Sequence, residues 1–355
     1  MLLILLIPMI ILLLSFKKSK VITFFGLLYM WIVFGFNSKN PDRSVYEDRY
    51  NLYDSWFDNF TEPLFTFSMK TFNAFHFHFQ SLYLFVGAFF LLSTFIYIAK
   101  TTKNANFVLG LILISTYAMH VVLIRTTYAI IFEIPALYVL LYEKFTMMRR
   151  LVIFFTLTII ACLIHAMCAL YLLLLIPFFI SRKKLTIYLW LIFPLIFIML
   201  DQIGREYLPH IMNKLGFIQK TEMVLERKSS NKTIAFLLAN LRLLSVTVFP
   251  ILYNWYNNHR PAKYKIVLSS VEIRIININI FMLCLIPLLY ISLDLYRLLY
   301  IICIVNFCMI SNHLKEKGMT LCSILYAMNI GYWFIWRPYF HDVIVTVFSN
   351  NFLTD

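Results

Sequence analysis

The stretch LVIFFTLTIIACLIHAMCALYLLLLIPFFI, residues 151–180, passes without a charged side chain and is broken only by His165. A helix that crosses a lipid bilayer needs about 20 apolar residues, so a single helix of this length would have to tilt strongly. The sequence therefore predicts two short helices, 151–164 and 166–180, or one helix that breaks between them.

The composition of the whole chain extends this prediction. Hydrophobic residues make up 61% of the 355 residues and charged residues only 14%, whereas a soluble domain is about one quarter charged. We therefore predict an all-α, polytopic integral membrane protein that forms a single transmembrane domain over 1–355, with about 12 transmembrane helices. The candidate segments are 1–16, 21–36, 80–99, 106–124, 127–142, 151–164, 166–180, 185–200, 234–252, 276–292, 295–312 and 318–336.

The net charge of +14 comes largely from short basic clusters between the apolar segments. This pattern is typical of cytoplasmic loops under the positive-inside rule, so nucleic acid is not an expected partner. If residues 151–180 cross the membrane twice, every cluster falls on the cytoplasmic face. The clusters are Lys17, Lys18, Lys20; Lys100, Lys103; Arg149, Arg150; Arg182, Lys183, Lys184; Arg260, Lys263, Lys265; and Lys315, Lys317.

This topology places the two longest polar connections, 37–79 and 201–233, on the outer side. Residues 62–79 are rich in aromatic side chains and are predicted to form an interfacial helix in the headgroup layer. Tyr46 and Tyr50, earlier in the first connection, lie at helical spacing. Aromatic side chains of this kind suit sugar stacking, although an ordinary interfacial belt of tyrosines explains them equally well.

Four polar side chains lie at the predicted outer ends of apolar segments. Because polar groups at membrane depth are costly, their gathering on one face predicts a site there. They are Arg125, His165, Asp294 and Arg297.

Each of these residues has two interpretations. Arg125 can bind a phosphate or diphosphate, or it can extend its head to water from a helix end. His165 can act as a general acid or base, or as a hydrogen-bonded packing residue. Asp294 and Arg297 share a helix face and can form a structural pair, or Arg297 can be a second anion ligand oriented by Asp294. Arg242, inside a predicted span, is a further candidate.

Motifs for nucleotides and metals are absent from the sequence. There is no Walker loop, GxSxG, HExxH or GxGxxG, and only 8 glycines occur in the chain. The six cysteines lie in apolar stretches without CxxC spacing. We therefore expect no cofactor and no metal site.

The order of several short motifs resembles the EpsG family of bacterial exopolysaccharide polymerases, which are Wzy-like. The resemblance begins at FGFNSKNPDRSVYEDRYNLYD, residues 34–54, with Asp42 followed by spaced tyrosines, and continues through Glu62-Pro63-Leu64-Phe65. The remaining matches are Phe79-Gln80, Ile124-Arg125-Thr126-Thr127-Tyr128-Ala129 with Thr126 in place of a Gln, Leu163 to Leu170 around His165, and Arg297-Leu298-Leu299-Tyr300. More remotely, the chain resembles membrane glycosyltransferases of the GT-C type, which use polyprenyl-linked donors.

Membership of this family would imply a polymerase that joins polyprenyl-diphosphate-linked oligosaccharide repeat units at the outer face of the bacterial plasma membrane. Its partners would be those lipid-linked substrates, membrane lipid, a flippase and a chain-length regulator. The predicted catalytic base is one of Glu62, Asp42 and His165.

The remaining candidate residues are expected to bind the diphosphate and the sugars of the substrate, or to lie at the membrane interface. The predicted ligands of the diphosphate are Arg125 and Arg297, with Arg242 as a weaker third. Tyr46, Tyr50, Gln80 and Asp294 complete the predicted sugar-binding and interfacial set.

Two other functions compete with a polymerase. A flippase or transporter of lipid-linked oligosaccharide would also use arginines for the diphosphate, but we find no internal repeat of the kind that transporters often show. A membrane acyltransferase that modifies glycans would need a catalytic histidine accessible from the cytoplasm, whereas His165 is predicted on the outer side.

Overall fold

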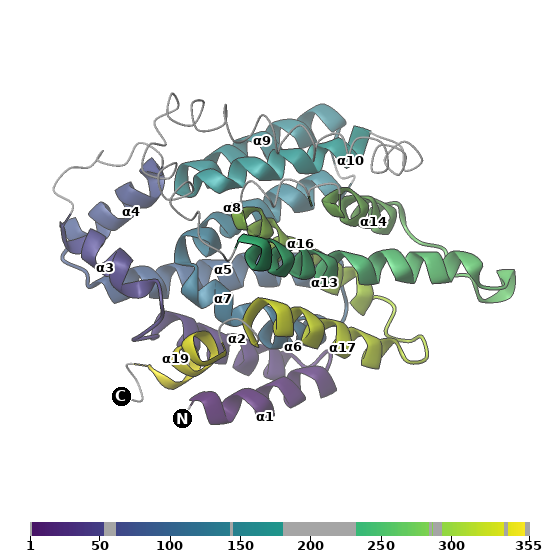
Figure 1. Cartoon of the computed structure of the whole chain (residues 1–355), viewed down its shortest axis with the longest axis horizontal. Coiled ribbons are helices and arrows are strands. Elements are labelled where there is room, and N and C mark those ends of the chain that lie inside the picture. Colours follow the sequence, from purple (N-terminus) through teal and green to yellow (C-terminus); the bar gives the residue numbers. More distant parts are fainter. Residues whose placement is uncertain are drawn as a thin grey trace. The chain divides into compact units, whose positions relative to one another are not determined.

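The structure is a computed structural model (Figure 1). It describes residues 2–52, 62–142, 145–179, 232–283, 286, 293–336 and 340–351. The chain divides into two compact units: unit 1 is Met1–Leu172 with Tyr300–Asp355, and unit 2 is Leu173–Leu299. The second outward connection, 201–233, lies almost wholly outside the described residues, as does the predicted segment 185–200.

The described residues are helical, which confirms the all-α prediction for this part of the chain. The α-helices are α1 (Leu2–Ser15), α2 (Lys20–Gly35), α3 (Arg43–Leu52), α4 (Pro63–Ala74), α5 (Phe79–Thr101), α6 (Ala105–Ser115), α7 (Tyr117–Val122), α8 (Ile124–Leu141), α9 (Met147–Ile164), α10 (Ile176–Phe179), α13 (Lys232–His259), α14 (Ser270–Leu283), α16 (Leu299–Ser311), α17 (Met319–Gly331) and α19 (Thr346–Ser349). The 3₁₀-helices are η1 (Ala166–Leu175), η2 (Ala262–Tyr264) and η3 (Leu293–Leu298), and the π-helices are η4 (Tyr332–Trp336) and η5 (Phe340–Val345).

Four of the described helices are long and apolar enough to cross a membrane: α5, α8, α9 and residues Phe236–His259 of α13. Shorter apolar helices accompany them, among them α1, α2 and α6. These helices support the membrane class of the protein. The count of about 12 spans, the GT-C likeness and the single domain stay predictions.

The break predicted inside residues 151–180 is present at His165. Helix α9 ends at Ile164, His165 has an extended backbone (φ −148°, ψ 107°), and η1 begins at the next residue. The predicted interruption is therefore confirmed, while the number of membrane crossings stays a prediction.

Another boundary differs from the prediction. The segment 106–124 is divided at Thr116, and α8 begins at Ile124, so Arg125 lies in the first turn of α8 and not at the end of the preceding segment. Apolar residues continue through this region, so hydropathy alone does not mark where one helix stops. Thr127 bridges the interruption, since its hydroxyl donates to the carbonyl of His120 (2.7 Å), a group at a helix end.

Helices α8 and α9 pack side by side in opposite directions. At one end, the Arg150 guanidinium donates to the carbonyl of Leu140. Midway along, Thr158 donates to the buried carboxylate of Glu133 (3.3 Å). At the other end, the start of α8 and the end of α9 come together, which brings Arg125 and His165 into the same region.

Helices α3 and α4 lie beside this end of unit 1, next to each other in Figure 1. Helix α4 begins with Pro63, a residue favoured in the first helical turn. It ends in a reversal at His76, which adopts a left-handed backbone (φ 57°) and leads into α5. The structure thus forms a helix within residues 62–79, while its location at a membrane interface stays a prediction.

The loops at the opposite end of unit 1 are basic. The connections α1–α2, α5–α6 and α16–α17 line one cavity and bring together Lys17, Lys18, Lys100, Lys103 and Lys315. Three of the basic clusters therefore lie on one face, as the predicted topology requires.

Candidate active site

A buried carboxylate joins three distant parts of the chain. Glu62 immediately precedes α4, and its side chain is 2% exposed. Its Oε2 accepts a hydrogen bond from Arg125 Nη1, and its Oε1 lies 2.7 Å from His165 Nδ1. These side chains come from the N-terminus of α4, the first turn of α8 and the break after α9. We call Glu62, Arg125, His165 and Tyr46 the Glu62 cluster.

Tyr46 supplies the fourth member from α3. Its hydroxyl accepts a hydrogen bond from Arg125 Nε (2.8 Å), and the guanidinium carbon lies 5.1 Å from the centre of its ring. The ring of Phe65, in the first turn of α4, packs edge-to-face against Tyr46 at 5.8 Å. Tyr46 therefore fixes the plane of the guanidinium from one side while Glu62 fixes it from another.

The Arg125 guanidinium can donate further hydrogen bonds. Nε and Nη1 of Arg125 are bonded, whereas Nη2 has no hydrogen-bond partner among the residues that the structure describes. The side chain of Arg125 is 19% exposed, compared with 3% for His165 and 2% for Glu62. Arg125 is thus the member of the cluster that can meet an anion arriving from outside, and its planar fork suits a phosphate.

The contact with Glu62 assigns roles to the two nitrogens of His165. In the neutral ring one nitrogen donates and the other accepts. Because Nδ1 faces an ionised carboxylate, it carries the proton, and Nε2 becomes the basic nitrogen. A carboxylate bonded to an imidazole in this way can orient the ring of a general base.

The charges within the cluster nearly cancel. Glu62 carries one negative charge and Arg125 one positive charge, and removing either from a buried pair typically costs about 3–5 kcal/mol. The cluster is therefore neutral with a neutral His165 and gains one positive charge when His165 takes up a proton.

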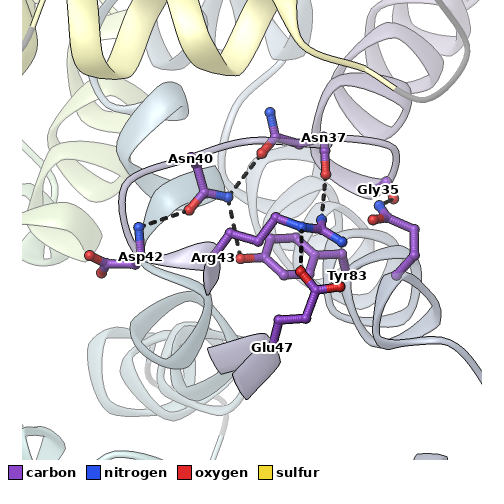
Figure 2. A network of polar contacts seen from close by, with 8 residues as sticks. Gly35, Asn37, Asn40, Asp42, Arg43, Glu47 and Tyr83 are labelled. Carbon is purple, nitrogen blue, oxygen red and sulfur yellow. Dashed lines mark hydrogen bonds and ion pairs between the residues drawn. The ribbon is translucent and has the colours of Figure 1, made fainter. Parts of the chain in front are cut away.

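A second polar network holds α3, and with it Tyr46, in place (Figure 2). Arg43 donates to the carbonyl of Asn37 (2.5 Å), pairs with Glu47 (3.4 Å) and stacks on the ring of Tyr83 at 5.3 Å. Asn40 donates to the side chain of Asn37 (2.9 Å) and to the Tyr83 hydroxyl (3.3 Å). Arg43 is buried one helical turn before Tyr46, so it acts on the cluster by positioning that helix.

The C-terminal region closes this network. Asn37 Nδ2 donates to the carbonyls of Val347 and Asn350 (both 3.2 Å), and Asn37 and Asn351 form an isolated antiparallel bridge. Asn351 in turn donates to the carbonyl of Ile32 (3.0 Å). Residues near the end of the chain thus stabilise the loop that leads into α3.

Three other predicted site residues belong to the framework around the cluster. The Tyr50 hydroxyl donates to the carbonyl of Phe77 (2.5 Å), which ties α3 to the turn before α5. Gln80 donates to the carbonyl of Gly35 and so ties α5 to α2. The backbone N–H of Asp42 donates to Asn40 (3.2 Å), and in Figure 2 the Asp42 carboxylate points away from Arg43. A role for Tyr50 or Gln80 in sugar binding, and for Asp42 as the base, stays a prediction.

The remaining candidates lie in the other unit. Arg242, in α13, is buried and stacks over the ring of Tyr296 at 4.6 Å. Arg297 and Asp294 lie in η3, and the side chain of Asp294 is outside the described set. A common site for these residues and the Glu62 cluster stays a prediction.

A comparison with known proteins identifies the family of the chain. A family model described as the EpsG family matches residues 20–345, nearly the whole chain. The chain belongs to the EpsG family. EpsG proteins are Wzy-like polymerases, so the resemblance inferred from the motifs is confirmed. No curated protein and no solved structure matched the chain.

The residues matched by the family model include every member of the Glu62 cluster, as well as Asn37, Asn40, Arg43, Glu47 and Tyr83. The motifs around Asp42, Glu62, Arg125 and His165 had signalled the cluster. The sequence analysis did not identify three residues of the second polar network: Asn37, Asn40 and Arg43. A buried arginine could have been suspected at Arg43, which lies between two acidic residues in PDRSVYE, residues 41–47.

Substitution of Tyr46 by Phe tests its hold on Arg125. The change removes the oxygen that accepts from Nε and keeps the ring, and a hydrogen bond to a charged group contributes about 1.5–3 kcal/mol. We expect the yield of polymer to fall about tenfold, as measured by gel separation of surface glycans from cells that express equal amounts of protein. Tyr256→Phe, at an exposed position on α13, is the control. Equal yields from both variants would show that the hydroxyl has no part in the reaction.

Proposed function

We propose that this EpsG protein joins polyprenyl-diphosphate-linked oligosaccharide repeat units into a surface polysaccharide at the outer face of the bacterial plasma membrane. The observation that carries the proposal is the buried Glu62 carboxylate, which bonds an imidazole through one oxygen and a partly exposed guanidinium through the other. Such a site offers a base and an anion ligand within one side-chain cluster.

The reaction needs both groups. A hydroxyl of the acceptor repeat unit attacks the anomeric carbon of the donor, so that a new C–O bond forms. The bond between that carbon and the diphosphate oxygen breaks, and its electron pair leaves with the polyprenyl diphosphate. The hydroxyl proton must be taken up, and the charge developing on the leaving group must be stabilised.

His165 is the base in this proposal. Its Nδ1 proton is directed to Glu62, so Nε2 can accept the proton of the attacking hydroxyl. Glu62 holds the ring in this orientation and stabilises the imidazolium that results. The sequence left three alternatives for the base, and the proposal takes His165 as the base and Glu62 as its orienting acid. The backbone of Asp42 bonds Asn40 at the start of α3.

Arg125 is the ligand of the leaving diphosphate. Two observations support this role: Nη2 has no hydrogen-bond partner in the described part of the chain, and Arg125 is more exposed than Glu62 and His165. Because Nε and Nη1 are already bonded to Tyr46 and Glu62, the guanidinium is oriented before the substrate arrives. Preorganised donors of this kind stabilise charge that develops during the reaction without further rearrangement.

Proton transfer and anion stabilisation are coupled through charge. Before the reaction the ion pair leaves the cluster neutral. When Nε2 accepts the proton, the cluster gains one positive charge at the moment when the diphosphate gains negative charge. In a partly buried site this attraction is stronger than it would be in water.

The outward orientation rests on the arrangement of unit 1. The cluster lies at one end of α8 and the basic loops lie near the other, as expected if the basic loops are cytoplasmic. Arg242 and Arg297 as further diphosphate ligands, and a flippase and a chain-length regulator as partners, remain part of the proposal.

A detergent assay separates this function from that of a flippase. The purified full chain, in detergent micelles, is given lipid-linked repeat units, and products are separated by size. A micelle has no inner and outer leaflet, so a flippase would give no chemical product. A polymerase gives joined repeats and releases one polyprenyl diphosphate for each linkage that it forms.

The same assay tests the base. His165→Gln keeps a polar side chain but has no basic nitrogen, and the loss of a general base lowers a rate about 10²–10⁴-fold. His259→Gln, at an exposed position of α13, should retain the wild-type rate. A His165→Gln variant with the rate of the control would exclude His165 as the base, and a lack of joined repeats in the wild type would exclude the polymerase.

A further inference from the structure

The opposite end of unit 1 contains a cavity that the proposed reaction does not use. The cavity is about 1050 Å³ and opens between the α1–α2, α5–α6 and α16–α17 connections. Five of the described residues that line it are lysines and none is acidic. The lysines are Lys17, Lys18, Lys100, Lys103 and Lys315.

An apolar groove adjoins the cavity. It has a volume of about 290 Å³ and runs between α5 and α8, where Leu92, Ile96, Ile131 and Pro135 line it. Lys100 lines both the cavity and the groove. The two spaces therefore adjoin each other at this lysine.

The side chains along the groove face outward on α5. Phe89, Leu92 and Ile96 recur at intervals of three and four residues, so they share one face of the helix, and each is more than 40% exposed. Phe16, exposed on the rim of the cavity, adds apolar surface beside the lysines. A ligand that fills both spaces must be anionic at one end and apolar at the other.

This region is separate from the Glu62 cluster. Tyr138 lines the groove, and Arg125 lies thirteen residues earlier on the same helix. At 1.5 Å per residue the two positions are about 20 Å apart along α8. The headgroup that binds in the cavity is therefore not the diphosphate proposed to bind at Arg125.

We propose that the cavity and the groove form a binding site for an anionic phospholipid. The phosphate-bearing headgroup lies among the five lysines, and an acyl chain lies along α5 in the groove. Lys100, whose ammonium lies 5.5 Å from the ring centre of Tyr138, marks the junction between headgroup and chain. Basic cavities between helices at a cytoplasmic surface are suited to such headgroups.

The positive-inside rule explains why lysines occur on these loops but not why an apolar groove ends at one of them. A site, in contrast to a diffuse positive surface, requires these particular lysines. A matched variant can make this distinction, because five other lysines among the described residues are exposed. They are Lys20, Lys39, Lys263, Lys265 and Lys317.

The test is a lipid titration followed by native mass spectrometry of the purified, delipidated full chain in an uncharged detergent. Phosphatidylglycerol is compared with phosphatidylcholine of the same acyl chains. We expect the wild type to bind phosphatidylglycerol about tenfold more tightly. Replacing the five cavity lysines by Gln should remove this preference, and replacing the five matched lysines should leave it.

A single substitution provides a test if the variant with five replaced lysines does not fold. Lys100→Gln alone, at the junction, should weaken phosphatidylglycerol binding about threefold without removing the other four charges. The proposed site would be contradicted if the wild type bound both lipids with equal affinity. It would also be contradicted if the cavity variant and the matched variant lost the preference for phosphatidylglycerol equally.

A competition experiment separates a lipid from a soluble anion. Glycerol 3-phosphate carries the same phosphate without the chains, and it should fail to displace phosphatidylglycerol at equal concentration, because it makes no contact in the groove. Displacement by glycerol 3-phosphate at equal concentration would overturn the lipid as the ligand. Because the lipid readout does not involve polymerisation, it is independent of the proposed function.

Discussion

Glu62→Gln should reduce the yield of long glycan chains about a hundredfold or more. Gln has the shape of Glu but no charge, so it cannot fix the tautomer of His165 or stabilise the imidazolium. It also leaves Arg125 without its buried counter-ion. The yield is measured on size-resolved surface glycans from a deletion strain that expresses the variant.

Asp48→Asn is the matched control, since Asp48 is an exposed acidic residue on α3. The melting temperatures of the purified proteins separate chemistry from folding, because a buried charge that loses its partner destabilises the fold by about 3–5 kcal/mol. A Glu62→Gln protein that folds and still makes long chains would remove Glu62 from the mechanism.

Arg125→Lys should lower polymer yield about 10–100-fold, although the positive charge is kept. A lysine ammonium cannot bond Tyr46 and Glu62 in one plane while a further donor remains for a diphosphate. We expect the loss to appear both in cells and in the detergent assay, with unreacted lipid-linked repeats accumulating in each.

Arg49→Lys, on α3, controls for the exchange of one basic side chain for another. If the Arg125→Lys variant matched this control, charge alone would suffice at Arg125 and the planar geometry of the guanidinium would be irrelevant. If Arg125→Ala also matched it, the diphosphate would bind elsewhere in the chain.

The class of the fold and several site residues could be predicted from the sequence. The uncharged run 151–180 and the composition indicated apolar helices, and His165 marked the break because a polar group within such a run must find a partner. Arg125 and Glu62 were identified by their motifs. What no local pattern reveals is their contact, because Glu62 and His165 lie 103 residues apart in the chain.

Helix boundaries were harder to predict than helix existence. The continuous hydropathy of residues 105–124 hides the breaks at Thr116 and Leu123, which depend on hydrogen bonds such as that between Thr127 and His120. The positioning role of Arg43 was hidden for another reason. Its partners include the carbonyl of Asn37, a loop held by residues near the C-terminus, and such long-range packing leaves no periodic signal.

The measurement that tests the central claim most directly is the fate of repeat units in a deletion strain. Surface and lipid-linked glycans are resolved by size, and the leaflet that holds the single units is determined by their accessibility from outside. The polymerase predicts that long chains are lost while single units still reach the outer face, and that wild type restores the chains whereas Arg125→Ala does not. Accumulation of single units on the inner leaflet, or glycans of unchanged length, would contradict it.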